Sequence, residues 1–216
     1  MQDAPFEDRA EAGRLLAHGL SDYRGRDDVV VLALPRGGVP VAFEVARRLA
    51  VPLDVFLVRK LGVPGREELA LGAIASGGIR VLNDRVIEAN EITTEQIEAI
   101  AARETDELAR RERAFRGDQP PADLGGRSVI LVDDGMATGA TMRAAVAAVL
   151  QQEAEAVIVA VPIADPDVCR SFRGHAREVV CLRTSATLRG VGAWYEDFSQ
   201  TTEDEVRDLL SQSRRP

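Results

Sequence analysis

Short segments of this chain are apolar at almost every position, and segments with a helical pattern lie between them. Residues 29–34, 128–132 and 156–161 have no polar face that alternates with an apolar one. Residues 53–58 and 179–182 follow the same pattern less perfectly. Strands that are apolar on both sides are typical of parallel sheets covered by helices on both faces. The sequence therefore predicts an α/β fold with a central, mainly parallel sheet.

The connecting segments carry recognisable start and turn signals. Residues 41–50 and 141–151 have an apolar stripe at helical spacing, and Asp165 before Pro166 is a typical helix start. Residues 76–78 are Ser-Gly-Gly between two apolar runs, which predicts a β-hairpin.

A long polar helix follows the hairpin. Thr93 and Gln96 form a capping box, and Gly117 is a typical residue after a helix end. The charges of residues 103–113 alternate in sign, so we expect that face to be a solvated surface.

Charge and composition argue against a nucleic-acid-binding protein. Of the 216 residues, 27 are Lys or Arg and 35 are Asp or Glu, which gives a formal net charge of −8. Nucleic-acid binding depends mostly on clustered Lys and Arg, and aromatic residues for base stacking make up only 4%. We expect no nucleic-acid partner.

The length and the apolar runs predict one soluble unit. A chain of 216 residues suits a single domain, with a core over about 28–185 and both ends, about 1–27 and 186–216, beside it. Apolar runs stay far below the ~20 residues of a membrane span, and the acidic N-terminus does not resemble a signal peptide. We expect a cytoplasmic protein with no membrane partner.

The two cysteines, Cys169 and Cys181, lie in no CxxC pair and have no histidine cluster around them. This spacing argues against a disulfide framework and against a zinc site. We expect two reduced structural thiols, as in most cytosolic proteins.

The segment that points to chemistry is 129–142. A buried strand ends in two adjacent carboxylates, Asp133 and Asp134, and a loop rich in Gly, Ala and Thr leads into a helix. Ligands of open parallel sheets bind at the carboxyl ends of strands, and backbone N–H groups at a helix N-terminus favour a phosphate. The acids fit beside a phosphate if they accept hydrogen bonds from hydroxyls, as on a ribose, or help to hold a divalent cation.

These fourteen residues resemble the signature of type I phosphoribosyltransferases. The resemblance implies that Asp133 and Asp134 act in catalysis by binding the ribose hydroxyls of 5-phosphoribosyl-1-diphosphate (PRPP), with Mg²⁺ held indirectly through those hydroxyls or water. It also implies a loop that binds the 5′-phosphate, made of Gly135, Met136, Ala137, Thr138, Gly139, Ala140 and Thr141.

The resemblance extends to the segment after the first apolar strand. Pro35, Arg36, Gly37 and Gly38 match the family's diphosphate loop, in which a strained, often cis peptide is typical. The Pro35–Arg36 bond is the counterpart, although the sequence alone does not show whether it is cis. A plain strand-to-helix turn with packing glycines is the competing interpretation.

Arg59 and Lys60 end the second predicted strand, and residues 61–68 are predicted to be a loop. In the family this place holds a mobile loop that closes over the reaction centre, preceded by basic residues near the diphosphate. By position, Glu68 is a candidate for orienting the leaving group or the nucleophile. Ordinary surface charges explain Arg59 and Lys60 equally well.

The acceptor side is less well defined. The resemblance implies a small hood, made from both chain ends, that covers the acceptor. Leu188 occupies the position where purine-using members stack an aromatic residue, so the candidate acceptor residues in the hood are Leu188, Trp194, Tyr195 and Phe198. Packing of the C-terminal segment is the alternative for these aromatics. Ala137 stands where enzymes for 6-oxopurines carry an acid, which argues against hypoxanthine or guanine.

The resemblance covers about residues 8–210 and implies transfer of phosphoribose from Mg-PRPP to a nitrogenous base, or the reverse. The alternative is a regulator that senses PRPP with little transferase activity. A receiver-type phosphoacceptor domain is disfavoured by the Thr-Gly loop after the acids, and a dinucleotide-binding fold by the lack of GxGxxG after a strand. Homodimers are common in the family, but the sequence shows no interface.

Overall fold

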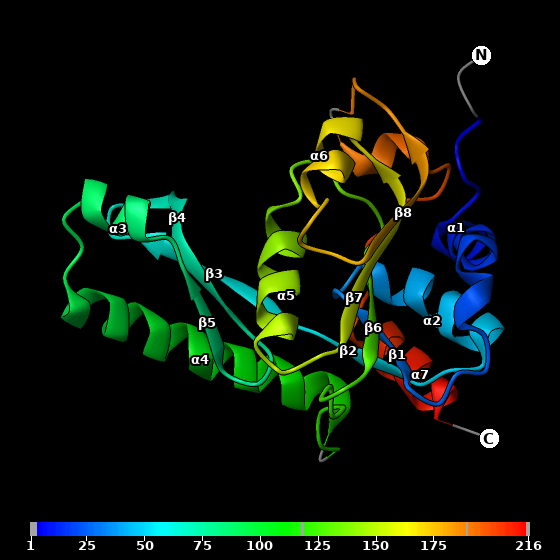
Figure 1. The fold of residues 1–216 in the computed structure, drawn as a ribbon, viewed down its shortest axis with the longest axis horizontal. Coiled ribbons are helices and arrows are strands. Elements are labelled where there is room, and N and C mark those ends of the chain that lie inside the picture. The colour runs from blue at the N-terminus through cyan, green and yellow to red at the C-terminus, as the bar shows by residue number, and fades with distance from the viewer. Residues whose placement is uncertain (1–3, 118, 189, 215–216) are drawn as a thin grey trace.

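A central sheet of five parallel strands organises the computed structural model, which describes residues 4–117, 119–188 and 190–214 (Figure 1). In spatial order the strands are β2 (Leu53–Val55), β1 (Val29–Ala33), β6 (Ser128–Val132), β7 (Ala156–Ala164) and β8 (Glu178–Thr184). Each neighbouring pair is parallel. The predicted α/β fold with a mainly parallel central sheet is confirmed.

Helices cover both faces of this sheet. The helices that pack on one face are α1 (Arg9–Leu16), the 3₁₀ helix η1 (Ala17–Tyr23), α2 (Gly38–Leu49) and α7 (Glu203–Ser213). Those on the other face are α5 (Ala140–Leu150) and α6 (Pro166–Ser171). Because both faces are covered, every residue of β1, β6 and β7 is buried.

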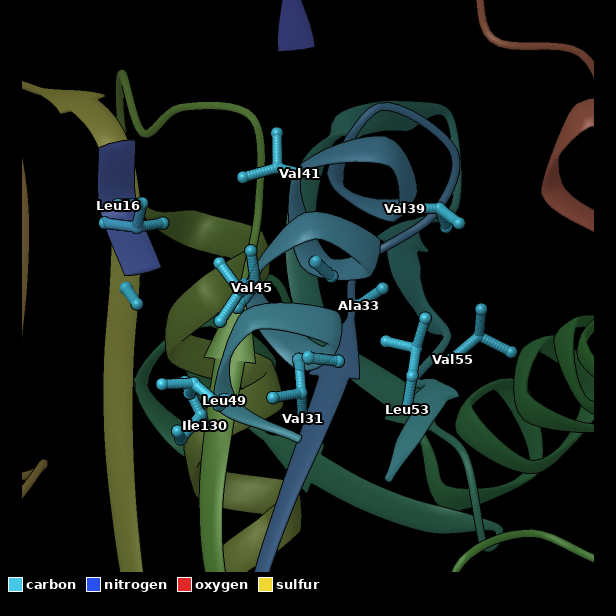
Figure 2. Close-up of a cluster of buried hydrophobic side chains, with 14 of the residues drawn as sticks. Leu16, Val31, Ala33, Val39, Val41, Val45, Leu49, Leu53, Val55 and Ile130 are labelled. Carbon is cyan, nitrogen blue, oxygen red and sulfur yellow. The ribbon is translucent and has the colours of Figure 1, made fainter. Parts of the chain in front are cut away.

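Alternate residues of each strand enter opposite cores. Val31 and Ala33 of β1 join Val45 and Leu49 of α2 in the cluster drawn in Figure 2. Residues between them, such as Leu32, face α5 instead. This period of two explains why the strands lack a polar face.

A second, antiparallel sheet extends from this core. It consists of β3 (Val58–Val63), β4 (Arg66–Ala75) and β5 (Ile79–Leu82), and it is followed by α3 (Asp84–Ala89) and α4 (Thr94–Arg116). We call these five elements the arm, which projects to one side in Figure 1. The arm has its own apolar cluster, in which Leu61, Val63, Leu71 and Ile74 are buried.

Two sequence predictions in this region are wrong. Residues 53–58 do not form one strand: β2 stops at Val55, and Val58 begins β3 in the other sheet. The predicted loop 61–68 is instead part of a hairpin, in which only Pro64 and Gly65 form the turn. Arg59 and Lys60 therefore lie in β3 and not at the end of a core strand.

Other local predictions are confirmed. Thr93 and Gln96 exchange both bonds of the capping box at the start of α4, which Gly117 ends with a φ of 65°. The hairpin around residues 76–78 joins β4 and β5. Asp165 caps α6, with Pro166 as its first residue.

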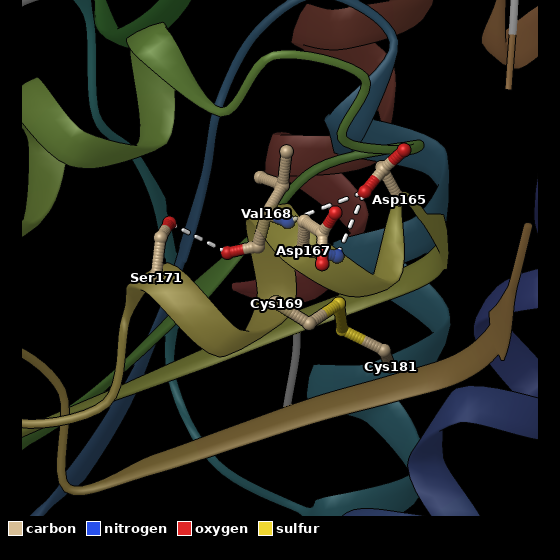
Figure 3. Close-up of a disulfide and its surroundings, with 6 residues drawn as sticks. All are labelled: Asp165, Asp167, Val168, Cys169, Ser171 and Cys181. Carbon is tan, nitrogen blue, oxygen red and sulfur yellow. Dashed lines mark hydrogen bonds between the residues drawn. A yellow bond between two sulfur atoms is a disulfide. The ribbon is translucent and has the colours of Figure 1, made fainter. Parts of the chain in front are cut away.

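The prediction of two reduced thiols is also wrong. Cys169 on α6 and Cys181 on β8 form a disulfide (Figure 3). The Asp165 side chain accepts the N–H groups of Asp167 and Val168, and this cap sets the direction in which α6 leaves the sheet. The helix then packs against β8, which brings together two cysteines that are 12 residues apart.

The N-terminal segment and the segment that precedes α7 meet above the carboxyl end of the sheet. The Phe6 N–H donates to the Trp194 carbonyl at 2.8 Å, and the Glu196 N–H donates to the Phe6 carbonyl at 2.8 Å. Phe6, Ala12, Ile163 and Tyr195 form a small buried cluster there. Among the described residues, no helix is both long and apolar enough to span a bilayer.

Candidate functional site

The loops after β1 and β6 meet at the carboxyl edge of the central sheet. These strands are neighbours, and the Leu34 N–H donates to the Val132 carbonyl at 2.9 Å just before the chains diverge. A Cβ atom on Gly37 would lie 2.1 Å from Oδ2 of Asp134, and one on Gly38 would lie 2.9 Å from Cα of Asp133. Glycine is required here because the loop presses directly on the acid pair.

The Pro35–Arg36 peptide in this loop is cis. The predicted counterpart of the family's special peptide thus has the unusual configuration. Pro35 and Arg36 are both half-buried, and α2 begins at Gly38, after the N-cap residue Gly37.

The two acids differ in their contacts. Asp133 Oδ1 accepts the Asp134 N–H at 2.8 Å, whereas Asp134 Oδ2 accepts Nε of Arg9 at 2.9 Å. The Tyr195 hydroxyl donates to the Asp134 backbone carbonyl at 2.6 Å. These bonds hold the pair at the sheet edge from both ends of the chain.

Burial dominates the electrostatics of the pair. It raises the pKa of Asp133 well above its usual value, and the neighbouring Asp134 raises it further. Burial also raises the pKa of Asp134, although the hydrogen bond and charge of Arg9 act in the opposite direction. Such a pair favours a ligand that brings positive charge or hydroxyl donors.

The predicted phosphate loop is tied down at its first half and open at its second. The Met136 N–H donates to the Ile163 carbonyl at 2.9 Å, and its carbonyl accepts the Asp165 N–H at 3.2 Å. Thr138, Ala140 and Thr141 are exposed beside the N-terminus of α5. Hydroxyls and helix N–H groups are therefore available to an anion.

Glycines shape this loop. Gly139 has a φ of 70°, and a Cβ there would lie 2.7 Å from Cγ1 of Val168. Gly135 meets the Val191 side chain in the same way, at 2.5 Å. Ala137 between them is half-buried. The small residues of the loop thus allow close packing on its sides away from solvent.

Arginines gather on the other side of the 35–38 loop. A pocket of about 160 Å³ is lined by Pro35, Arg36, Leu57, Val58, Arg59, Arg111, Phe115 and Glu203. Arg59 pairs with Glu104, and Arg111 pairs with Glu107. The sequence predicts that the face of α4 containing Arg111 is a solvated surface. In the structure Arg111 lines this pocket, and the alternating charges of the segment gave no sign of that.

The remaining candidates lie in the arm or among the chain ends. Glu68 is fully exposed and lies 3.6 Å from Nζ of Lys60. Lys60 also lines a pocket of about 340 Å³ between the arm and α5, together with Thr141 and Arg143. The arm thus brings Lys60 to the predicted phosphate loop, whereas Glu68 points to solvent.

The hood candidates separate into packed and open residues. Tyr195 is 6% exposed, with its ring 5.4 Å from that of Phe6 and 5.2 Å from that of Phe198. Leu188 and Trp194 are half-buried against the same cluster. Phe198 keeps 38% of its surface exposed. Tyr195 therefore packs the chain ends, as the alternative interpretation expected.

Sequence reasoning missed Arg9. This residue is the first of α1, whose start is set by the Asp8 side chain accepting the Glu11 N–H. It lies 125 positions from Asp134, and no local spacing links the two. Only the folded arrangement of the chain ends reveals the contact.

Comparisons with known proteins agree with this geometry. The sequence model of one family, the phosphoribosyl transferase domain, matches residues 7–193. The chain belongs to the type I phosphoribosyltransferase family. A Mycobacterium tuberculosis relative named for an inferred phosphoribosyl transferase activity is 48% identical over 210 residues. That alignment covers 97% of this chain and 47% of the relative, so the chain spans about half the length of the curated relatives it matches.

Two solved structures are also similar to this chain. The crystal structure of TT1426 from Thermus thermophilus is 45% identical, with a TM-score of 0.85, and covers 96% of this chain and 98% of its own. The AQ2163 protein from Aquifex aeolicus is 12% identical, with a TM-score of 0.50, over 94% of this chain and 84% of its own. The second likeness concerns the fold alone.

Proposed function

We propose that this phosphoribosyltransferase family member binds Mg-PRPP and transfers phosphoribose to or from a nitrogenous base. The observation that carries the proposal is the contact between the loop after β1 and the acid pair after β6, where Gly37 and Gly38 leave no room for a side chain. Two loops that the family uses for one substrate thereby form one site.

Each part of the site has a role in the donor complex. The hydroxyls of Thr138 and Thr141 and the N-terminus of α5 hold the 5′-phosphate. Arg36 and Arg59 line one pocket and hold the diphosphate as cations, and the backbone of the glycine loop approaches it closely. Lys60, which lines the pocket with Thr141, adds positive charge between the diphosphate and the 5′-phosphate.

The acids bind the ribose. Within the described residues, the side-chain contacts engage Oδ1 of Asp133 and Oδ2 of Asp134. The other oxygen of each carboxylate is left for ribose hydroxyls, or for water on a Mg²⁺ ion that arrives with the substrate. Oxygen ligands of this kind fit Mg²⁺, which supplies charge neutralisation for the departing diphosphate.

In the transfer step, the bond between ribose C1 and the diphosphate oxygen breaks and a ring nitrogen of the base forms the new bond to C1. The diphosphate leaves with the electron pair, and the N–H proton of the base passes to solvent water. Carboxylates near the ribose stabilise the positive charge that develops on the sugar. Glu68 remains a candidate for orienting a reactant, and it takes part only if the arm turns its tip toward the acids.

We propose that the chain forms a single domain. Residues from both ends of the sequence form a hood that covers the acceptor side of the site. Phe198 is the exposed aromatic face in that region, and Leu188 and Trp194 line the cluster beneath it. A PRPP-sensing regulator is the second candidate, because Tyr195 is used for packing and Leu188 offers no ring for stacking. Cytoplasmic location and homodimer formation remain predictions.

Isothermal titration of PRPP into the purified protein, with and without Mg²⁺, tests the donor site. Ribose 5-phosphate and NAD serve as controls, and bases are then screened for turnover. We expect Mg²⁺-dependent binding, which is lost in the Asp133→Asn/Asp134→Asn double variant. Hydrogen bonds to charged groups contribute about 1.5–3 kcal/mol each, so affinity should fall on the order of 100-fold or more. No binding at millimolar PRPP would overturn the proposal, and binding without turnover on any base would favour the regulator.

A further inference from the structure

Arg9 connects three parts of the molecule with one guanidinium group. Its Nε donates to Asp134 Oδ2 at 2.9 Å, and its Nη1 donates to the Ser199 carbonyl at 2.8 Å. The centre of the group lies 3.9 Å from the ring centroid of Phe198. The side chain is 11% exposed, so these contacts are largely shielded from water.

The contact on Asp134 bears on the donor site directly. Asp134 Oδ2 is confined between Arg9 and the Gly37 backbone, since a Cβ on Gly37 would lie only 2.1 Å away. On the backbone side, the Asp134 N–H donates to Asp133 Oδ1 at 2.8 Å, which fixes the main chain that carries this carboxylate. With Arg9 in place, one oxygen of Asp134 is held and the other keeps a defined direction.

A different arginine fastens the N-terminal segment to β8. Arg183 of β8 donates to the Ala4 carbonyl and lies 3.9 Å from the ring centroid of Phe6. It thus makes the same kinds of contact as Arg9, with one aromatic ring and one backbone carbonyl. The described contacts of Arg183 include neither Asp133 nor Asp134. What distinguishes Arg9 is its bond to the acid pair.

We propose that Arg9 is a positioning residue of the donor site: it orients the Asp134 carboxylate toward the ribose and ties the segment at Phe198 and Ser199 to that carboxylate. This inference rests on the proposed function. It adds the N-terminal helix α1 to the PRPP site and couples the C-terminal hood to donor binding. A planar guanidinium suits this role because it donates in two directions while it lies over a ring, whereas an ammonium can keep only the pairing with Asp134.

The test compares Arg9→Gln, Arg9→Lys and Arg183→Gln by isothermal titration with Mg-PRPP, ribose 5-phosphate and Mg-diphosphate. Arg9→Gln should weaken Mg-PRPP and ribose 5-phosphate roughly 10- to 100-fold, the value of a hydrogen bond to a charged group. Mg-diphosphate has no ribose hydroxyls, so its affinity should stay within about twofold. Arg9→Lys should recover part of the loss, since an ammonium can still pair with Asp134.

Arg183→Gln is the matched control. It loosens the contact of the N-terminal segment with β8 without touching the acids, so its Mg-PRPP affinity should equal that of the wild type even if its melting temperature falls. Wild-type affinity in Arg9→Gln, a loss in Arg183→Gln as large as in Arg9→Gln, or no recovery in Arg9→Lys would overturn the positioning role. Absence of Mg-PRPP binding in the wild type would instead overturn the proposed function, and this inference with it.

Discussion

The strands of the central sheet and those of the arm are buried to different extents. Every residue of β1, β6 and β7 is buried, because helices cover both faces. In the arm, β5 alternates between half-buried and exposed residues, and the outer half of β4 is exposed. The fold of the central sheet is therefore encoded by continuous apolar segments. The fold of the arm depends on the apolar residues of one face of its sheet and on their packing against α4.

The difference teaches where a rigid site can be built. The acid pair and the 35–38 loop follow strands that are hydrogen-bonded to parallel neighbours on both sides. Glu68 and Lys60 belong to the hairpin of the arm, where local opening requires the loss of fewer buried contacts. The acid pair and the glycine loop of the proposed donor site therefore belong to the first region, and the second region adds Arg59 and Lys60 from β3.

The largest expected effect is at the joint between the two regions. Arg116 at the end of α4 pairs with Asp54 of β2 at 2.8 Å, with 4% and 10% of their side chains exposed. Arg116→Ala leaves the Asp54 charge buried without its partner, which should cost about 3–5 kcal/mol in the free energy of unfolding. Urea denaturation measures this change.

Arg110→Ala is the control for that joint, because Arg110 pairs with Glu107 on the exposed face of the same helix. It should leave the urea midpoint unchanged. Equal midpoints for Arg116→Ala and the wild type would show that the arm does not depend on this ion pair for its attachment.

The next effect separates the two cores. Leu71 in the arm and Leu131 in β6 are both fully buried, so either Leu→Ala change should cost about 3 kcal/mol. Hydrogen exchange distinguishes the results. Leu71→Ala should speed exchange of amides in β3, β4 and β5 only, whereas Leu131→Ala should speed exchange throughout the central sheet. Uniformly faster exchange in Leu71→Ala would mean that the arm and the sheet unfold as one unit.

The sequence predicted the elements whose signals are local. Continuous apolar runs predicted the strands of the central sheet, and the Thr93–Gln96 pair predicted the start of α4. The 61–68 hairpin was missed because Gly62 was interpreted as a loop residue. In the structure, a Cβ on Gly62 would lie 2.9 Å from the Glu67 carbonyl oxygen, at an irregularity in the strand pairing. The glycine permits close approach within a strand.

The site was predictable in part for the same reason. The acids, the phosphate loop and the 35–38 loop each occupy a contiguous segment, so a resemblance could identify them. Arg9 and Arg111 enter the neighbourhood only through tertiary packing, and their local sequence has no distinctive signal. The Cys169–Cys181 disulfide was missed likewise, because it depends on how α6 packs against β8.

A smaller effect tests whether the acid pair belongs to the rigid region. A Cβ on Gly38 would lie 2.8 Å from the Val132 carbonyl oxygen, and one on Gly72 in the arm would lie 2.4 Å from that of Val81. Each Gly→Ala change should cost about 2 kcal/mol by overpacking against backbone. Only Gly38→Ala should also weaken Mg-PRPP binding in calorimetry. If Gly72→Ala weakened it equally, the loss could not be assigned to the contact between the glycine loop and the acid pair.

The smallest effect lies at the edge of the central sheet, where a polar contact replaces burial by helices. The Tyr23 hydroxyl donates to Glu178 at 2.6 Å, and burial, followed by this bond, raises the pKa of Tyr23 to about 12. The folded state then holds the proton more tightly than the unfolded state, whose tyrosine titrates near pH ~10. The stabilisation is fully present below pH ~10 and disappears as the pH rises to about 12. Tyr23→Phe should cost about 1 kcal/mol at pH ~8, or roughly 2–4 °C in melting temperature. The difference in melting temperature between the wild type and Tyr23→Phe should disappear in melts between pH ~10 and ~12. A difference that persisted above that range would show that the Tyr23 hydroxyl contributes nothing through its proton.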